Sequence, residues 1–355
     1  MTPSFGFACT EAGAPMKPWS FERRDLREDD VRIEITHCGV CHSDIHQARN
    51  DWGWATYPLV PGHEIVGRVA EVGSGVSGFK VGDKVGVGCM VDSCQECPSC
   101  AEGLEQYCEN GMTQTYADKD RRDGQPTYGG YSDQIIVRDK FVLRMPESID
   151  LAAAAPLLCA GITTYSPLKH VGLAKGHKLA VVGLGGLGHM GIKFGVAMGA
   201  EVTLFTRSPA KEAEARALGC THVVLSTDEA QMQAVAGTFD FILDTVPVPH
   251  DLNPYVATLK RDGTHIIVGV IGPLDPPVSG ANLIIGRKSV IGSLIGGIAE
   301  TQEMLDFCAE HDIACDIEMI RMAEINEAFE RTVKGDVHYR FVIDMASLKD
   351  AKQAA

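Results

Sequence analysis

The distribution of apolar residues changes along the chain and separates two kinds of folded region. Up to about residue 150, short apolar or alternating segments, such as residues 31–35 and 65–72, are separated by turns rich in glycine and proline. Alternation with a period of two residues is typical of half-buried strands, so this part predicts a β-barrel-like domain. Residues 113–127 are polar and predict an exposed loop within it.

From residue 177 onwards, compact apolar segments alternate with segments of helical character. The expected strands are residues 179–182, 202–205, 223–225, 241–243 and 266–268. Strands that are apolar throughout and separated by helices are typical of a parallel sheet covered on both faces. We therefore expect an α/β fold class, in which a β-barrel domain accompanies a doubly wound parallel sheet.

Composition and charge narrow the possible functions. The 355 residues are 45% hydrophobic and 22% charged, with a net charge of −15. An acidic balance disfavours binding to a nucleic-acid backbone, which requires basic patches. No apolar stretch reaches the roughly 18 residues of a membrane span, and the first 16 residues show no signal-peptide pattern. We therefore expect a cytoplasmic protein with no nucleic-acid or membrane partner, whose 12 cysteines stay mostly reduced.

A glycine-rich loop follows the expected strand at residues 179–182. Its sequence is Gly183-Leu184-Gly185-Gly186-Leu187-Gly188. In this pattern the first glycine permits a tight turn, the second lets the backbone approach a pyrophosphate, and the third lets the next helix pack closely. Amide groups at the helix N-terminus bind the phosphates. The context favours a dinucleotide site over a glycine-rich turn without a ligand.

The residues after the next strand select the dinucleotide. NAD-binding folds usually place an acidic residue there, whereas this chain has Thr206, Arg207, Ser208 and Lys211. No carboxylate repels a 2′-phosphate, and hydroxyl groups and two cations are present to bind it, so the segment favours NADP(H) over NAD. The alternative is that both cations are ordinary surface charges, but cations at a helix start oppose the helix dipole.

Four cysteines form a compact group in the first region. Cys94, Cys97, Cys100 and Cys108 are separated by two, two and seven residues. Four thiolates make a closed tetrahedral site, which is typical of structural zinc without a catalytic role. An iron–sulfur cluster is the competing metal interpretation, although the Cys-Pro ending of the common bacterial run is absent. Four free thiols are the remaining alternative.

A second set of metal ligands comes from three separate segments. Cys41, His63 and Cys159 offer two thiolates and one imidazole. Three such ligands hold a catalytic zinc with one open position, where the metal polarises a substrate oxygen. We therefore predict a second, catalytic zinc on these residues.

Neighbouring residues extend this second site. Glu64 is interpreted either as a transient fourth ligand or as a carboxylate that contacts a ligand, and Asp44 is expected to fix the tautomer of His63. Three further residues are rival ligands by type but are expected to serve packing or the surface; these are His37, Cys38 and Cys89.

Reduction of a carbonyl group also requires a proton. Ser43 lies two residues from Cys41 and is expected to hydrogen-bond the substrate oxygen. His46 is expected to exchange the proton with water through the cofactor ribose, because imidazoles titrate near neutral pH. We therefore predict a relay from Ser43 through the ribose to His46.

Together these motifs resemble the zinc-dependent medium-chain alcohol dehydrogenases, and most closely the cinnamyl alcohol dehydrogenase type, which includes NADPH-dependent aldehyde reductases. The resemblance covers nearly the whole chain. It rests on residues 39–44, 61–64, 94–108, 159–163 and 183–188. A set of two cysteines and one histidine is a known catalytic zinc site of alcohol dehydrogenases.

The resemblance implies a GroES-like catalytic domain in two parts, residues 1–154 and 298–355, around a Rossmann NADP-binding domain at residues 155–297. It also implies a homodimer joined through the Rossmann sheets, and an active-site cleft between the domains. Further cofactor contacts are expected at Thr163, Thr245, Gly269, Val270, Ser293, Leu294 and Ile295. The substrate cleft is expected to be lined by Asp51, Trp54 and Ile295.

The sequence thus predicts a reversible, zinc-dependent aldehyde reductase that uses NADPH. The neighbouring Trp52 and Trp54 favour aromatic or medium aliphatic aldehydes. One alternative is conjugate reduction of enals or iminium groups on the same fold, which is disfavoured because both relay residues are present. A non-catalytic protein that binds zinc or NADP is the alternative from another class.

Overall fold

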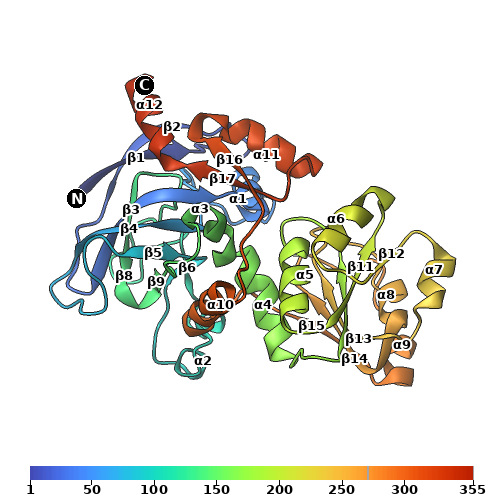
Figure 1. Ribbon diagram of the computed structural model, residues 1–355. Helices are drawn as coiled ribbons and strands as arrows, with labels where there is room; N and C mark the ends of the chain where they lie inside the picture. Colours follow the sequence, from blue (N-terminus) through green and yellow to red (C-terminus); the bar gives the residue numbers. More distant parts are fainter. Residues whose placement is uncertain (270–271, 355) are drawn as a thin grey trace. The chain divides into compact units, whose positions relative to one another are not determined.

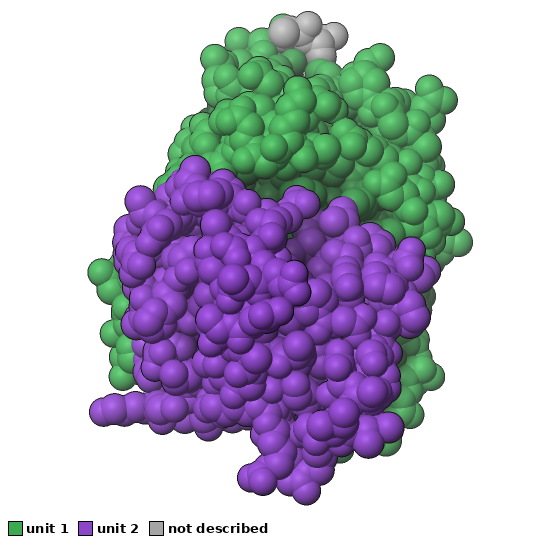
Figure 2. Space-filling model, turned by 90° about the vertical axis from the view of Figure 1, so that its right-hand side faces the viewer, with its two compact units in different colours: residues 1–159, 296–355 green, residues 160–295 purple. Residues whose placement is uncertain are grey.

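The computed structural model describes residues 1–269 and 272–354. The chain forms two compact units (Figure 2): unit 1 is Met1–Cys159 with Gly296–Ala355, and unit 2 is Ala160–Ile295. The boundaries differ by a few residues from the expected ones. Helix α3 (Leu151–Ala154) and the 3₁₀ helix η3 (Ala155–Leu158) pack against strands of unit 1 rather than opening unit 2. Cys159 therefore belongs to the same unit as Cys41 and His63.

Unit 1 is built around a mixed sheet of strand order β16-β17-β3-β4-β5-β9, with β8 also paired to β3 (Figure 1). The central strand β3 is long because its inward residues are apolar and fully buried, as at Val31 and Ile33. The strands are β3 (Asp30–Gly39), β4 (Ile65–Val72), β5 (Lys84–Val87), β8 (Gln134–Arg138), β9 (Leu143–Arg144), β16 (Ile317–Arg321) and β17 (Arg340–Asp344).

Smaller elements complete unit 1. Strands β1 (Thr2–Ala8) and β2 (Lys17–Arg23) form a hairpin, and β6 (Met90–Asp92) pairs with β7 (Thr113–Gln114). The remaining helices are α1 (His42–Arg49), α2 (Pro98–Ala101), α10 (Ile298–Glu310), α11 (Ile325–Lys334) and α12 (Leu348–Ala354). The C-terminal segment returns to this unit because β17 pairs with β3. The expectation of an exposed loop at residues 113–127 is partly wrong, because Thr113, Thr115 and Tyr116 are buried.

Unit 2 is a parallel sheet of strand order β12-β11-β10-β13-β14-β15. The chain fills one half of the sheet from β10 to β12 and then the other half from β13 to β15, so the order reverses between β10 and β13. Ligands of such folds bind at the carboxyl ends of the strands at this reversal. The strands are β10 (Lys178–Val182), β11 (Glu201–Thr206), β12 (His222–Leu225), β13 (Phe239–Asp244), β14 (Leu259–Ile267) and β15 (Ser289–Gly292).

Helices cover both faces of this sheet, as the apolar strands predict. In Figure 1, α4 and α5 lie together on one side, and α7, α8 and α9 lie together on the other. The helices are α4 (Ala160–His170), α5 (Gly188–Ala197), α6 (Glu212–Ala217), α7 (Glu229–Ala234), α8 (Asn253–Thr258) and α9 (Gly280–Gly286). Phe205, Phe239 and Ile242 form the centre of a fully buried apolar cluster.

Among the described residues, no single helix has the length and apolar character needed to cross a membrane, although the bent pair Leu151–Leu158 and Ala160–His170 meets both criteria when taken together.

Phe205→Ala should destabilise unit 2 by about 3–5 kcal/mol, because it removes a fully buried ring and leaves a cavity. Its ring packs edge-on against Phe239 at 5.3 Å. Urea unfolding followed by circular dichroism measures the loss. Val196→Ala, at a position exposed by 39%, is the control and should change stability little. Equal effects of the two substitutions would contradict this account of the core.

Candidate functional site

Cys41 lies where strand β3 gives way to helix α1. Its backbone is extended (φ −115°, ψ 153°), and it caps the N-terminus of the helix. The carboxylate of Asp44 accepts a hydrogen bond from the amide of Cys41 at 2.9 Å. An acidic residue in the first turn stabilises the start of a helix, so this contact fixes the backbone that carries the Cys41 thiol.

The same carboxylate holds the segment that carries His63. Oδ1 of Asp44 accepts a hydrogen bond from the amide of Gly62 at 3.0 Å and lies 3.5 Å from Nδ1 of His63. Tyr131 donates its hydroxyl to Oδ2 at 3.1 Å. Asp44 is completely buried. The structure thus brings Asp44 and His63 together, as the sequence predicts.

With Nδ1 directed at Asp44, the other ring nitrogen of His63 is buried and has no hydrogen-bond partner among the described residues. The ring stacks on Tyr116, with centroids 5.6 Å apart and planes at 18°. A buried polar atom without a partner costs free energy unless it binds something. Nε2 of His63 is therefore held in place as a potential ligand atom.

Cys159 follows η3 and brings the second thiol to the same place. Its Sγ lies 3.9 Å from Sγ of Cys41. Two thiolates on one tetrahedral zinc lie about 3.8 Å apart, because each Zn–S bond is about 2.3 Å long. The hydrogen bond with Cys159 lowers the pKa of the Cys41 thiol well below its ordinary value. The potential ligand atoms of Cys41, His63, Glu64 and Cys159 lie within 4.8 Å of one another, so these residues fit a zinc ion.

The carboxylate of Glu64 contacts a buried arginine and also lies beside this ligand group. Its Oε1 pairs with Nη2 of Arg340, which comes from strand β17. Its Oε2 is buried and has no partner among the described residues. Burial raises the pKa of Glu64 to about 7, and the charge of Arg340 opposes this rise. The geometry accommodates both interpretations of Glu64, as a ligand and as a carboxylate beside the ligands.

The four-cysteine group is equally compact. The Sγ atoms of Cys94 and Cys100 lie 3.9 Å apart. Backbone amides point at the sulfurs, from Cys94 to Cys108 and from Cys97 to Cys94, both at 3.4 Å. Amide donors stabilise thiolates, because hydrogen bonds to a charged form favour it. All four ligand atoms lie within 4.8 Å of one another, which fits a closed tetrahedral zinc site.

Ser43 and His46 lie on helix α1 beside the first group. The hydroxyl oxygen of Ser43 is 3.7 Å from Sγ of Cys41. Residues three apart share one face of a helix, so His46 lies on the same side. Nδ1 of His46 lies 2.8 Å from Oδ2 of Asp51. Asp51, expected to line the substrate cleft, therefore orients His46.

The rings of two tryptophans lie next to one another beside His46. The ring of Trp52 lies 5.1 Å from that of His46, and Trp54 lies 5.4 Å from Trp52. Trp54 is 52% exposed, so its ring is not part of a core. This exposure is compatible with the expected place of Trp54 in the substrate cleft.

Several residues near the first group are not found by sequence reasoning. Cys89 was expected to serve packing or the surface, yet its thiol lies beside Cys159, and a hydrogen bond with Cys159 lowers the pKa of Cys89. Cys38 is fully buried and, like Cys89, lies outside the two candidate metal groups of the described residues. The residues that the sequence did not predict at all are Tyr116, Tyr131 and Arg340. All three contact the ligand segments through tertiary packing, which leaves no local pattern in the sequence.

The glycine-rich loop of unit 2 has the geometry of a dinucleotide cradle. Gly183 ends strand β10 with φ 89°, a conformation that favours glycine. A side chain at Gly188 would collide with the carbonyl group of Gly183, whereas the position at Gly185 faces open space. Helix α5 begins at Gly188, directly after the loop. Each glycine therefore has the steric role that the motif assigns to it.

The residues after strand β11 present polar groups outward. Arg207 and Ser208 are exposed, and the amide of Ser208 donates a hydrogen bond to Oγ1 of Thr206 at 3.1 Å. Lys211 pairs with Glu214 at 2.9 Å, so part of its charge is already balanced. Of the two cations, Arg207 is the better candidate for a 2′-phosphate.

Of the remaining expected cofactor contacts that the structure describes, Thr163 lies in helix α4 and the others follow strands β13, β14 and β15. Thr163 is buried in helix α4, and Gly269 packs against the backbone of Thr245. Val270 lies outside the described residues. Beyond β15, the amide of Ser293 bonds the carbonyl oxygen of Ile267 at 3.2 Å. Leu294 is 42% exposed, while Ile295 is buried with φ 37°.

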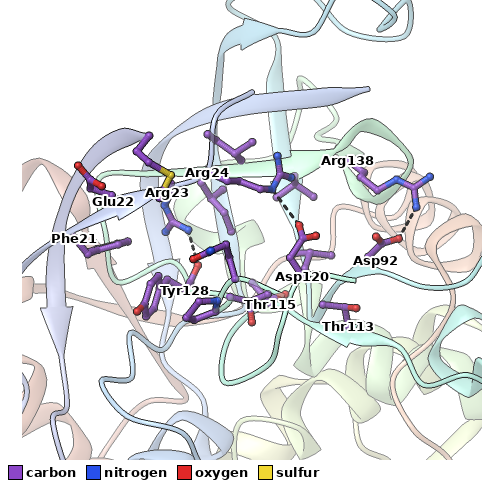
Figure 3. Close-up of a pocket in the computed structure, with 18 residues that line it drawn as sticks. Phe21, Glu22, Arg23, Arg24, Asp92, Thr113, Thr115, Asp120, Tyr128 and Arg138 are labelled. Carbon is purple, nitrogen blue, oxygen red and sulfur yellow. Dashed lines mark hydrogen bonds and ion pairs between the residues drawn. The ribbon is translucent and has the colours of Figure 1, made fainter. Parts of the chain in front are cut away.

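A separate cavity of about 180 Å³ in unit 1 contains none of these ligands (Figure 3). Charged side chains in its wall form ion pairs with one another: Asp92 pairs with Arg138, and Asp120 pairs with Arg24 at 3.1 Å. Arg23 donates hydrogen bonds to the carbonyl oxygens of Tyr128 and Gly129. These contacts hold the segments around strand β2 together, and the cavity is separate from the candidate site.

Comparison with known proteins agrees with this geometry. Residues 27–147 match the family described as alcohol dehydrogenase GroES-like domain, and residues 186–310 match the family described as zinc-binding dehydrogenase. The chain is 55% identical to aldehyde reductase YahK of Escherichia coli K12 over 96% of this chain and 97% of that protein.

Two solved structures are similar over the whole chain. A cinnamyl alcohol dehydrogenase from Sorghum bicolor is 46% identical with a TM-score of 0.94, covering 97% of this chain and 98% of that chain. An enzyme named CAD from Helicobacter pylori, complexed with NADP(H), is 43% identical with a TM-score of 0.91, covering 97% and 99%.

Metal analysis of the purified protein should find about two zinc ions per chain, one for each ligand group. Cys159→Ser should lower the content to about one and abolish aldehyde reduction, because it removes a ligand of the open site. Cys97→Ser should also leave about one zinc ion per chain, because it removes a ligand of the four-cysteine group. Its main effect should be a lower unfolding temperature. A content of two zinc ions in Cys159→Ser would contradict the ligand assignment.

Proposed function

Because this chain belongs to the zinc-binding alcohol dehydrogenases, we propose that it reduces aldehydes to primary alcohols, reversibly, with NADPH as hydride donor. The observation that carries the proposal is the buried group in unit 1. Nε2 of His63 has no partner among the described residues, and the thiols of Cys41 and Cys159 lie 3.9 Å apart. A zinc ion bound there supplies a Lewis acid for the aldehyde oxygen.

The residues around this group position the substrate and move a proton. Ser43, two residues from the ligand Cys41, donates its hydroxyl proton toward the substrate oxygen. His46 is half-buried and is oriented by Asp51 at 2.8 Å, so it exchanges protons with water. Asp44 keeps Cys41 and His63 in place through their backbone and side-chain contacts. These roles are consistent with a proton relay of which Ser43 and His46 are members.

Unit 2 carries the hydride donor in this proposal. The turn at Gly183 and the open space at Gly185 admit a pyrophosphate, and the end of strand β11 has no carboxylate to repel a 2′-phosphate. Arg207 and Ser208 are exposed there to bind it. The H. pylori relative was solved with NADP(H), which supports the same choice for this chain.

The residues that we propose as substrate contacts come from unit 1 and from the end of unit 2. The exposed ring of Trp54, tilted by 32° against that of Trp52, favours aromatic or medium aliphatic aldehydes, and Asp51 and Ile295 are the other proposed neighbours. Conjugate reduction is less favoured because Ser43 and His46 are both in position. A non-catalytic role is less favoured because a purely structural zinc has no need of an open position.

With aromatic aldehydes, the purified protein should show a higher kcat/KM with NADPH than with NADH. Arg207→Ala should raise the KM for NADPH about tenfold by removing a charge-assisted contact, and should leave the KM for NADH nearly unchanged. Arg261→Ala, at an exposed arginine of the same unit, is the control. Faster turnover with NADH in the wild type would overturn the cofactor assignment.

We further propose that the protein is a cytoplasmic homodimer joined through unit 2. The cysteines of both candidate metal groups are thiols and not disulfides, as expected in a reducing compartment. Strand β15 is at one edge of its sheet, and an unprotected edge can pair with a second copy. Ile284 and Ile285 in the neighbouring helix α9 are exposed by 82% and 87%, which favours their burial in an interface.

Light scattering should give a mass of twice the 38.2 kDa of one chain. Replacing Ile284 and Ile285 together by aspartate should produce monomers, because charges are unfavourable in the centre of an apolar interface. Val333→Asp, at an exposed valine of α11 in unit 1, should leave the dimer intact. A dimer that persists in the double variant would rule out this interface.

A further inference from the structure

A buried cluster of two histidines and one aspartate lies at the carboxyl end of strand β13. Nε2 of His250 lies 2.9 Å from Oδ2 of Asp244, and Nε2 of His265 lies 3.0 Å from the same oxygen. Asp244 and His265 are almost completely inaccessible, and His250 is half-buried. The aspartate therefore joins the loop after β13 to the neighbouring strand β14. None of these residues has a role in the function proposed above.

This cluster is not a metal site. In the part of the chain that the structure describes, only two groups bring three or more potential ligand atoms all within 4.8 Å of one another, and both are in unit 1. The ring of His265 has one nitrogen, Nδ1, that is buried without a partner among the described residues. His265 therefore contacts Asp244 through Nε2 alone, by one hydrogen bond.

His250 is different because both of its ring nitrogens face acceptors. Its Nδ1 lies 2.9 Å from the carbonyl oxygen of Val248, and its Nε2 faces Asp244. A neutral imidazole carries one N–H and satisfies only one of them, whereas an imidazolium donates to both. The hydrogen bond with Asp244 raises the pKa of His250 above its ordinary value. The geometry and the direction of the pKa shift agree on a protonated ring.

Residues 245–250, which end at His250, contact the glycine-rich loop through Thr245. Oδ1 of Asp244 accepts a hydrogen bond from the amide of Val246 at 3.1 Å, and Thr245 donates its hydroxyl to the carbonyl oxygen of Val182 at 2.7 Å. A side-chain carbon built on Gly183 would lie 3.3 Å from Oγ1 of Thr245. Thr245 and Val246 thus lie beside the cradle at the reversal point of the sheet, and they begin the segment that ends at His250.

We propose that the contact of His250 with Asp244 positions residues 245–250 as a wall of the dinucleotide site, so that protonation of His250 strengthens the binding of the cofactor. This inference rests on the proposed function, because it assumes that unit 2 binds a nicotinamide dinucleotide. His250 acts through the wall and is a positioning residue.

The other charged and titratable groups around His250 are few. Asp251 follows it in the chain, and the ring of Tyr255 on helix α8 lies 5.9 Å away and is itself influenced by the charge of Arg207. His265 approaches from strand β14. Because the folded state raises the pKa of His250 above the ordinary 6.5, the contact is fully formed below that pH. It is lost as the pH rises through the value of the folded protein.

The test is the dissociation constant of the full-length protein for NADPH and NADH, measured by nicotinamide fluorescence from pH 5.5 to 9.5. His250→Gln retains only one side-chain donor group for the two acceptors. We expect it to weaken binding about fivefold at low pH, since one charged hydrogen bond is lost. This difference from the wild type should disappear at high pH. NADH is the second probe because it lacks the 2′-phosphate, which itself titrates near pH 6.

His222→Gln is the matched control, because His222 is 64% exposed at the start of β12 in the same unit. It should bind both dinucleotides like the wild type. The wild type alone gives a second readout: its affinity for NADH should fall as the pH rises, whether or not His250→Gln folds. A wild-type affinity for NADH that is flat with pH, or a ratio of variant to wild type that is constant with pH, overturns the positioning role and leaves the proposed function intact. A wild type that binds no dinucleotide overturns both.

Discussion

The candidate catalytic site depends on one buried carboxylate. Asp44 accepts hydrogen bonds from the amides of Cys41 and Gly62 and from the hydroxyl of Tyr131, and it lies 3.5 Å from His63. A buried charge is stable only when several donors surround it. Two of these donors come from the segment after β3 and the segment before β4. Their hydrogen bonds to Asp44 therefore hold the two segments together. The two segments carry Cys41 and His63. The positions of the thiol and the imidazole therefore depend on the hydrogen bonds that satisfy Asp44.

The other parts of the site are arranged around that point. Cys159 stays with unit 1 because the helical turns before it pack on the central sheet, and its thiol then lies 3.9 Å from that of Cys41. Arg340 reaches Glu64 from strand β17 of the C-terminal segment, which returns to unit 1 by pairing with β3. In unit 2, Asp244 has a comparable role, since it ties the loop after β13 to the strand and to His265. Each unit thus has a buried aspartate whose hydrogen bonds hold a loop next to a candidate site.

Much of this was accessible from the sequence, and the exceptions have physical causes. The fold class, the strands of unit 2, the four-cysteine group and the glycine-rich loop could be predicted because each is encoded by local periodicity or short spacing. Cys41, His63 and Cys159 come from three separate segments and were predicted from their residue types. Arg340 could not, because it is 276 residues from its partner Glu64. Tyr116 was missed because a polar segment predicts exposure, whereas stacking on His63 buries it. The role of Asp51 was assigned to the substrate, since nothing in the sequence shows that a turn after α1 directs it back to His46.

The most direct test of this account is the rate at which zinc leaves the protein to a chromophoric chelator, compared between the wild type and Asp44→Asn. An amide keeps the volume of the side chain but loses the charge that the surrounding donors and His63 require. We predict two phases in the wild type. In Asp44→Asn, the phase that belongs to Cys41, His63 and Cys159 should become about 10–100 times faster, while the phase of the four-cysteine group stays unchanged. Equal release rates in both proteins would contradict the claim that Asp44 holds the catalytic metal site together.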